Sequence, residues 1–400
     1  MYEYCTEEEP PRPADFPYHL GQTFSIRRHR APPPFAPKYR YPPGMRRLDD
    51  CWKGPSEELS HFEQVLQNPP QERPPGADEE DKDAGLDKDP SPPDLDTVYT
   101  LHVVEEIVAR AGHGAQVLRC RIDGFDGNEG DPCMDTKYVA KITMQLITAP
   151  ANSLAIFQGA NGRYTPAYYG SWTFDLPVPQ DGSADRPATR PVRLILIEYI
   201  AGKSMYALLK EGVVDKMPIP RRLELMAEAM ESLCQLEFLG IEHTDFESRN
   251  VLVLDSALNQ PTNTGTDDHS QSVVIIDFNR SYVYVSHWMA DRHREPRQEM
   301  VCSPMDRFWG DTLELQFAAW IPHIYHMRVP AFNGWLQHRW GNMADHYDVP
   351  SPEERRLIGL DEATEYIPPE SISLPEPRIP GKVLRSLDPN YDAWLLNDSD

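Results

Sequence analysis

Positive charge is scarce in this chain: 39 lysines and arginines stand against 63 aspartates and glutamates, which gives a formal net charge of −24. Such a chain repels nucleic-acid phosphates and anionic lipid head groups, so we expect neither nucleic acid nor a membrane as a partner. Apolar runs are short as well, and none approaches the roughly 20 residues that span a bilayer. The acidic start, MYEYCTEEEPPRP, lacks the apolar segment of a secretory signal.

Cysteine pairs with metal-binding or disulfide-framework spacing are missing. The six cysteines are scattered, with no C-x-x-C motif and no paired histidines, so neither a zinc site nor a disulfide framework is indicated. Reduced thiols fit a cytoplasmic protein best, and a nuclear one is not excluded. The cysteines are Cys5, Cys51, Cys120, Cys133, Cys234 and Cys302.

Proline is abundant, and its distribution divides the chain. Many of the 40 prolines lie in the first hundred residues, where they remove backbone donors and interrupt helices and central strands. Residues 77–96 are highly charged and almost free of apolar side chains. We therefore predict that residues 1–96 form a disordered, proline-rich extension and linker.

A basic island lies in this extension. It is either a docking peptide for a protein partner or a solubilising stretch, and the interspersed prolines favour the second interpretation. The island consists of Arg27, Arg28, Arg30, Lys38, Arg40, Arg46 and Arg47.

After Thr97 the pattern becomes that of short strands. In residues 116–122, apolar Leu118, Cys120 and Ile122 alternate with arginines, the period of a strand with one buried face. Further strands are predicted at 137–144, 167–175 and 192–199, and the last has the apolar run of a sheet interior. These segments predict a small, mostly antiparallel sheet.

After Gly202 helical periods dominate. Ser204 can cap a short helix, and residues 220–239 have the apolar face of a long one that ends at Gly240. Two strands, 251–255 and 272–278, should form a hairpin with a polar insertion, and more helix is expected beyond Pro304. The fold class is therefore α+β with two lobes, in residues 97–202 and 203–345, and a C-terminal tail in 346–400.

The densest chemical signal runs from His243 to Val253, HTDFESRNVLV, and continues with Ile275-Ile276-Asp277-Phe278. It resembles the catalytic loop and metal-binding strand, H-x-D-x-x-x-x-N followed by D-F-G, of the protein-kinase and aminoglycoside-phosphotransferase-like superfamily. Phosphoryl transfer needs a carboxylate that orients the attacking hydroxyl and oxygen ligands for Mg²⁺. The resemblance implies that Asp245 is the catalytic carboxylate, that Asn250 and Asp277 bind the metal, and that His243 braces the loop.

Two upstream segments resemble the nucleotide-binding parts of the same superfamily. Residues 138–142, YVAKI, are similar to the V-A-I-K strand, which implies Lys141 at the ATP phosphates and Ala140 in the nucleotide pocket. Residues 110–117 lie where the glycine-rich loop is expected, which implies that Gly112, Gly114 and Val117 cover the nucleotide.

Residues 198–202, EYIAG, match the hinge, whose backbone at Glu198 and Ile200 would pair with the adenine edge. The implied cofactors are thus ATP and Mg²⁺.

Over residues 97–345 the chain resembles uncharacterised fungal kinase-like proteins, especially in 303–322, SPMDRFWGDTLELQFAAWIP. Gly202-Lys203-Ser204 imitates a Walker A ending, but Ile197 replaces its first glycine, so a P-loop is rejected.

The sequence also departs from the kinase pattern. No Asp or Glu lies between Lys141 and Asp175 to pair with the lysine, and no A-P-E motif follows Asp277. Asn279 replaces the usual glycine, which is tolerable because asparagine enters left-handed conformations readily. Two functions therefore stay open: a phosphotransferase acting on an unknown hydroxyl acceptor, and a pseudokinase that binds nucleotide, or binds partners through its lobes or its proline-rich front.

Overall fold

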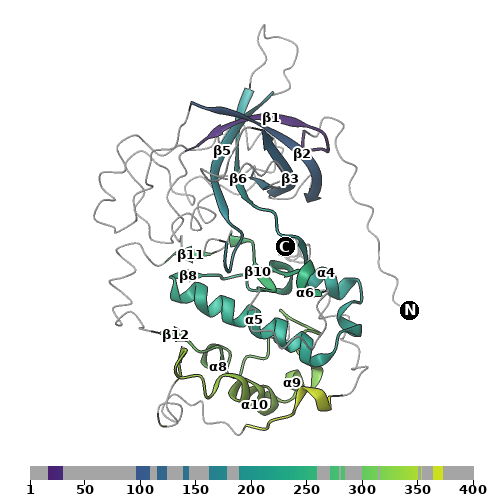
Figure 1. The fold of residues 1–400 in the computed structure, drawn as a ribbon, viewed down its shortest axis with the longest axis vertical. Coiled ribbons are helices and arrows are strands. Elements are labelled where there is room, and N and C mark those ends of the chain that lie inside the picture. The colour runs from purple at the N-terminus through teal and green to yellow at the C-terminus, as the bar shows by residue number, and fades with distance from the viewer. Residues whose placement is uncertain are drawn as a thin grey trace, which may run out of the picture. The chain divides into compact units, whose positions relative to one another are not determined.

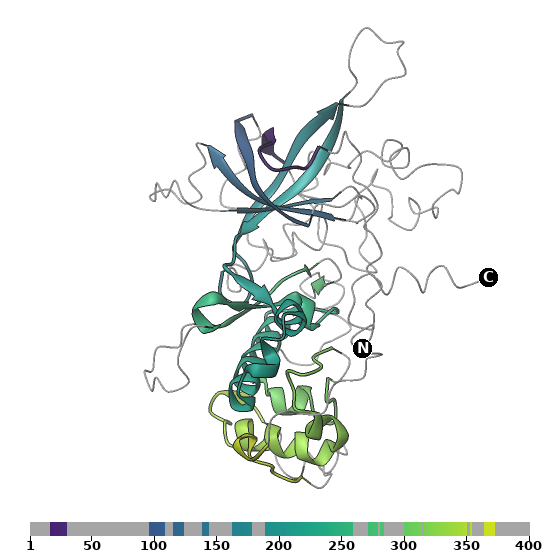
Figure 2. The ribbon, with the colours of Figure 1, turned by 90° about the vertical axis from the view of Figure 1, so that its right-hand side faces the viewer.

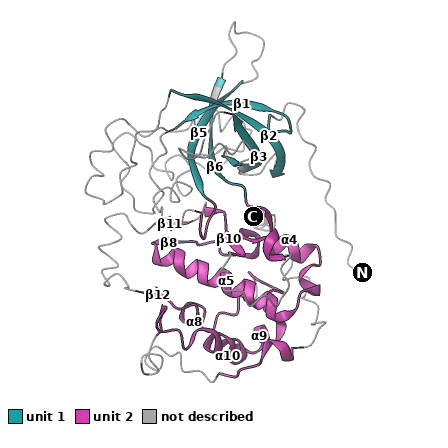
Figure 3. Ribbon diagram, viewed as in Figure 1, with its two compact units in different colours: residues 1–156, 167–199 teal, residues 157–166, 200–400 magenta. Residues whose placement is uncertain are grey.

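The computed structural model describes residues 17–29, 96–108, 115–123, 138–143, 162–177, 189–258, 271–278, 281–283, 300–313, 316–349, 353 and 364–372. It forms two compact units (Figure 3). Unit 1 comprises residues 1–156 and 167–199, and unit 2 comprises residues 157–166 and 200–400. The boundary between Tyr199 and Ile200 falls inside the segment that was predicted to be the hinge.

Unit 1 is a six-stranded sheet that closes on itself (Figures 1 and 2). All of its pairings are antiparallel and run in the order β1-β2-β3-β4-β6-β5, with β5 returning to β1. The small antiparallel sheet predicted from sequence is therefore a closed barrel. Its strands are β1 (Thr23–Arg28), β2 (Val98–Val108), β3 (Ala115–Asp123), β4 (Tyr138–Thr143), β5 (Tyr168–Pro177) and β6 (Thr189–Glu198).

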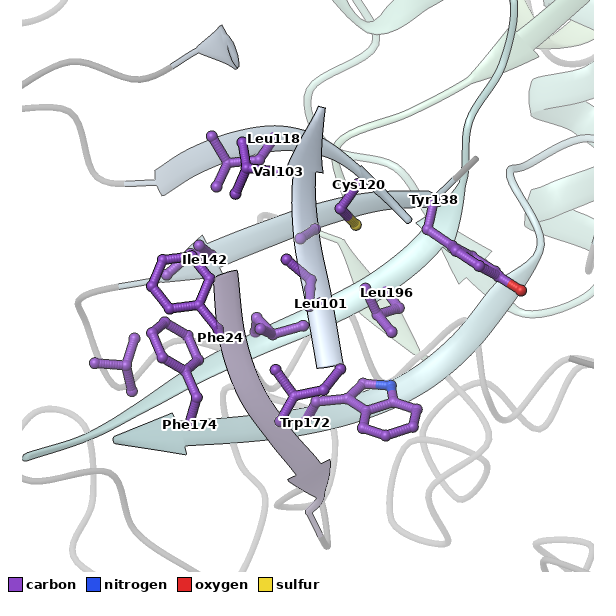
Figure 4. Close-up of a cluster of buried hydrophobic side chains, with 14 of the residues drawn as sticks. Phe24, Leu101, Val103, Leu118, Cys120, Tyr138, Ile142, Trp172, Phe174 and Leu196 are labelled. Atoms are coloured by element: carbon purple, nitrogen blue, oxygen red, sulfur yellow. The ribbon is translucent and has the colours of Figure 1, made fainter. Parts of the chain in front are cut away.

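Alternating apolar residues of all six strands fill the barrel. Figure 4 shows Phe24 of β1, Leu118 of β3, Trp172 of β5 and Leu196 of β6 in one buried cluster. Phe24 and Phe174 pack with their ring centroids 4.6 Å apart. β6 lies between β4 and β5, as its apolar run predicted.

β1 corrects the prediction that residues 1–96 are a disordered extension throughout. Between Pro17 and Pro32 the sequence holds no proline, and Phe24 and Ile26 alternate with exposed residues, so this segment can pair as a strand. Two arginines of the basic island take part. Arg27 forms an ion pair with Asp175, and the Arg28 guanidinium lies 4.2 Å from the centre of the Trp172 ring. The other members of the island lie outside the described residues.

Unit 2 is built around one long helix, α5 (Ile219–Phe238), which begins after Pro218 and ends before Gly240, a glycine with φ +88°. This helix confirms the prediction for 220–239. The hydroxyl of Ser204 accepts the Ala207 N–H and caps α4, as expected. The other helices in its described residues are α4 (Met205–Lys210), α6 (Asp255–Leu258), α8 (Pro304–Arg307), α9 (His323–Met327) and α10 (Val329–Trp340), with 3-10 turns η3 (Val214–Lys216), η4 (Ser248–Asn250) and η6 (Pro369–Ser371).

Short strands complete unit 2. β9 (Val251–Leu254) pairs antiparallel with both β7 (Gly202–Ser204) and β10 (Val273–Ile275), which confirms the predicted hairpin. β8 (Ile241–Glu242) pairs with β11 (Tyr282–Val283), and β12 (Val301–Cys302) pairs in parallel with β13 (Tyr347–Asp348). No helix in the described part of the chain is both long enough and apolar enough to cross a bilayer.

The predicted domain limits shift at both ends of unit 2. Tyr164 belongs to unit 2 because its carbonyl accepts the N–H of Ile275 at the end of β10. Part of the predicted tail, 346–400, belongs to it as well. β13 lies in that range, and residues 364–372 run across the α9–α10 pair, where Tyr325 donates to the Ile367 carbonyl at 2.7 Å.

A close backbone crossing between residues 364–372 and α10 generates the first prediction. A Cβ added to Gly334 would collide with the backbone carbonyl of Glu365. In Gly334→Ala this overpacking, which costs about 1–3 kcal/mol, should outweigh the roughly 1 kcal/mol gained in helix propensity. Urea unfolding should therefore show a lower free energy of unfolding. Glu365→Ala is the control, since it removes only an exposed ion pair with Arg328 and should cost less than about 1 kcal/mol. A more stable Gly334→Ala protein would contradict the crossing.

The second prediction concerns His29, which follows β1. Burial, together with the charges of Arg193 and Arg27, lowers the pKa of His29 to about 3. Because this value lies below the unfolded pKa of about 6.5, the contribution of His29 to stability is present above about pH 6.5. It is lost as the pH falls toward 3, by up to about 1.4 kcal/mol per pH unit.

His29→Asn keeps a polar group near the Ser171 hydroxyl, 3.2 Å from His29 Nδ1, and removes the titration. Urea unfolding is measured at several pH values between 4 and 7, with pulsed hydrogen exchange of β1 and β5 peptides as the readout. The free energy of unfolding should decrease less steeply with falling pH in this variant. Identical slopes in both proteins would contradict a neutral, buried His29.

Candidate functional site

The candidate site is the loop from His243 to Asn250, which joins β8 to β9 in unit 2. Its backbone is held at several points: the Asn250 N–H donates to the Glu247 carbonyl at 2.8 Å, and the Ser248 N–H donates to the Gln316 carbonyl at 3.1 Å. Phe246 packs on Phe317, with ring centroids 4.8 Å apart. Segments distant in sequence therefore fix the path of this loop.

Asp245 is held at both carboxylate oxygens. Arg249 Nη2 donates to Oδ1 at 2.8 Å, and Asn250 Nδ2 donates to Oδ2 at 3.0 Å. Asn250 Nδ2 also donates to the backbone carbonyl of Asp245 at 2.9 Å. Because the amide nitrogen of Asn250 faces Asp245, its amide oxygen points the other way and can serve as a ligand.

β10 brings Asp277 next to this loop. Residues Val251 and Ile275 are register partners of the β9–β10 pair, and the Ile276 N–H donates to the Asn250 carbonyl at 2.8 Å. Asp277 follows with φ +63°, a left-handed conformation that is uncommon outside glycine, although aspartate tolerates it. The turn buries Phe278.

His243 connects the loop to the end of β10. It is only 4% exposed, and its Nε2 lies 2.9 Å from the Ile276 carbonyl, to which it must donate because a carbonyl only accepts. Its ring meets the Phe278 ring edge-on at 4.9 Å. Burial lowers the pKa of His243, against the opposing influence of the Ile276 hydrogen bond and of the Asp277 and Asp245 charges. His243 thus braces the loop against the end of β10, the role that the sequence predicted.

Sequence reasoning missed three supporting residues. Glu228 of α5 accepts the N–H groups of Ser272 and Val273, at 2.5 and 3.2 Å, and so holds the start of β10. Burial raises the pKa of Glu228. Arg249 and Glu247 form an ion pair beside Asp245. A helix glutamate gives no sequence signal for such a contact, whereas Arg249 stood inside the motif and carried no assigned role.

In unit 1, Lys141 lies in β4 and is half-buried, with Val117 and Ile195 as its cross-strand partners. Partners directly opposite one another share a face of the sheet, so Lys141 and Val117 are neighbours, in keeping with their predicted joint role. Ala140 was predicted in the same pocket, and this is wrong. It is fully buried in the barrel core, on the opposite face. The two-residue period places Val139 on the face of Lys141 instead.

The remaining predicted residues divide between the two units or fall outside the described ranges. Glu198 ends β6 and pairs with Ala167 through its backbone N–H, at 2.8 Å, and through its carboxylate, at 3.0 Å. Ile200 begins the second segment of unit 2. Gly112, Gly114 and Asn279 lie outside the described residues. Gly202-Lys203-Ser204 forms β7, and Lys203 pairs with Glu211, which supports the rejection of a P-loop.

Asn250 and Asp277 carry oxygen atoms of the kind that hard divalent cations bind. Among the described residues, no three His, Cys, Asp or Glu side chains gather as a metal cluster. Mg²⁺, however, commonly takes one or two protein carboxylates and completes its shell with water and phosphate oxygens. Asn250 and Asp277 are the residues of this site that could hold such an ion.

Comparisons with known proteins give a limited kinase likeness. No family model matches the chain. A 68-residue stretch is 29% identical to serine/threonine-protein kinase PknG of Mycobacterium leprae, and it covers 17% of this chain and 9% of that protein. Among solved structures, the autoinhibited serine kinase domain of the giant muscle protein titin matches at 14% identity and a TM-score of 0.30, over 46% of each chain. The chain is therefore similar over a short stretch to a serine/threonine kinase, and each match spans less than half of the protein it was compared with.

Proposed function

We propose that this protein is an ATP- and Mg²⁺-dependent phosphotransferase that moves the γ-phosphate to a hydroxyl of an unidentified acceptor. One observation carries the proposal: the carboxylate of Asp245 is held by Asn250 and Arg249 in a loop whose last residue is hydrogen-bonded to the strand end that bears Asp277. The short likeness to a bacterial serine/threonine kinase supports it.

Asp245 is assigned as the catalytic carboxylate. Each carboxylate oxygen has two lone-pair sites. One site on Oδ1 is used by Arg249 and one on Oδ2 by Asn250, so each oxygen retains a further site to accept an acceptor hydroxyl. Asp245 would orient that hydroxyl and take its proton as the oxygen attacks phosphorus.

Asn250 and Asp277 are assigned as the ligands of Mg²⁺, through the amide oxygen and the carboxylate. When bound, the ion would neutralise the charge of the phosphates. In unit 1, Lys141 is assigned to the phosphates and Val117, with Val139 in place of Ala140, to the adenine, while the backbone at Glu198 and Ile200 would pair with the adenine edge.

The second candidate function is a module that binds nucleotide, or a protein partner through the proline-rich front, without turnover. Its motivation is the absence of any Asp or Glu between Lys141 and Asp175 in the sequence. An active kinase normally pairs this lysine with a glutamate. The acceptor, whether protein or small molecule, stays open, and a cytoplasmic or nuclear setting accords with the free thiols of Cys120, Cys234 and Cys302.

The third prediction separates these functions. Purified protein with Mg²⁺ and radiolabelled ATP should hydrolyse or transfer the γ-phosphate, and Asp245→Asn should reduce the rate about 10²- to 10⁴-fold, since it removes the proton acceptor. Asp277→Asn should also lose turnover, and asparagine tolerates the left-handed backbone there. Asp215→Asn, at an exposed turn of unit 2, is the matched control and should retain full turnover.

Melting temperatures complete this experiment. ATP with Mg²⁺ should raise the melting temperature of the unsubstituted protein, and Asp277→Asn should weaken that rise. A rise without any phosphate transfer would favour the binding module. Equal turnover in the unsubstituted protein, Asp245→Asn and Asp277→Asn would contradict the phosphotransferase assignment.

A further inference from the structure

The guanidinium of Arg249 lies between two carboxylates of the candidate loop. One nitrogen, Nη2, donates to Asp245 Oδ1 at 2.8 Å, and the other, Nη1, pairs with Glu247 Oε2. All three side chains are largely shielded, with 20% of Arg249, 14% of Asp245 and 25% of Glu247 exposed. Ion pairs shielded in this way are screened by solvent less than surface pairs are.

The two contacts of Arg249 have different consequences. The bond to Glu247 fixes the planar fork of the guanidinium, and the fork then presents its second nitrogen to Asp245 in a defined direction. Asn250 holds the other oxygen of the same carboxylate. A carboxylate held at both oxygens cannot rotate about its terminal bond, so the free lone pairs of Asp245 keep a constant direction.

The backbone of the loop is held by contacts other than those of the Arg249 side chain. It is fixed separately by the Ser248–Gln316 and Asn250–Glu247 backbone hydrogen bonds and by His243 on Ile276. Loss of the guanidinium would therefore leave the loop path in place and release only the Asp245 carboxylate.

We propose that Arg249 is a positioning residue that fixes the direction of the Asp245 carboxylate, and that Glu247 is the anchor that orients Arg249. The inference rests on the proposed phosphotransferase function. It adds that Glu247 orients Arg249 and that Arg249 orients Asp245. Lysine cannot replace this arginine fully, because an ammonium is a point donor without a fixed two-pronged geometry.

The experiment measures kcat and the KM for ATP in Arg249→Lys, Arg249→Gln and Arg249→Ala. Misplacement of a reacting group by about 1 Å can cost about 100-fold, so we expect kcat to fall about 10- to 100-fold in the last two variants. Arg249→Lys should fall less, and the KM for ATP should change little in all three. Glu247→Gln, which weakens only the anchor, should show a smaller loss than Arg249→Gln.

A matched control is available in the same unit. The side chain of Arg221 is 18% exposed, and its guanidinium also makes two contacts, with Glu224 and with the Ala257 carbonyl. Arg221→Gln should lower the melting temperature about as much as Arg249→Gln does, with kcat unchanged. If Arg249 had a merely structural role, Arg249→Gln and Arg221→Gln would have the same kcat.

Two further measurements test the mechanism. Free guanidinium at millimolar, non-denaturing concentration should restore part of the kcat of Arg249→Ala, and should not restore that of Asp245→Asn. In the double variant Asp245→Asn/Arg249→Gln, the loss should be close to that of Asp245→Asn alone, because Arg249 acts through Asp245.

The outcomes distinguish a failure of the positioning role from a failure of the phosphotransferase assignment. Turnover in the unsubstituted protein with unchanged kcat in Arg249→Gln overturns the positioning role and leaves the phosphotransferase assignment standing. Fully additive losses in the double variant also overturn it, since they would mean that Arg249 acts independently of Asp245. An absence of turnover in the unsubstituted protein overturns the phosphotransferase assignment and the positioning role together.

Discussion

The site depends on Asn250, which is bonded on two sides. Its side-chain amide donates to the carboxylate and the backbone carbonyl of Asp245, and its own carbonyl accepts the N–H of Ile276. One 4%-exposed residue thus connects the loop that carries Asp245 to the strand end that carries Asp277. Buried polar groups are costly unless they are bonded, so this arrangement constrains the relative position of loop and strand strongly.

Sequence periodicity was sufficient for elements whose burial is regular. α5 was predictable because its apolar residues recur with the helical period along the face that packs in unit 2. The same holds for β3 and β6, whose alternating or continuous apolar residues mark a buried face. The spacing of Asp245, Asn250 and Asp277 placed them on one loop and the adjoining hairpin, because a short loop and a hairpin leave few ways to separate these residues.

Strand pairings between distant parts of the sequence were harder to predict. β1 lies about 70 residues before its partner β2 and inside a proline-rich region, so composition outweighed the local alternation of Phe24 and Ile26. Among the described strands, β1 closes the barrel because it pairs with both β2 and β5. Ala140 was assigned wrongly because the match to the V-A-I-K motif outweighed the local strand pattern. The two-residue period of β4 decides which side chain faces away from the core.

The ion pairs of the candidate loop and the backbone strain beside it bear on its interpretation as a functional site. Arg249 pairs with the carboxylates of Asp245 and Glu247, and burial lowers the pKa of His243. Asp277 also adopts a positive φ. A left-handed aspartate lowers stability. Proteins retain such local strain mainly at functional sites, so the conformation of Asp277 supports the choice of this loop and strand end as the candidate site.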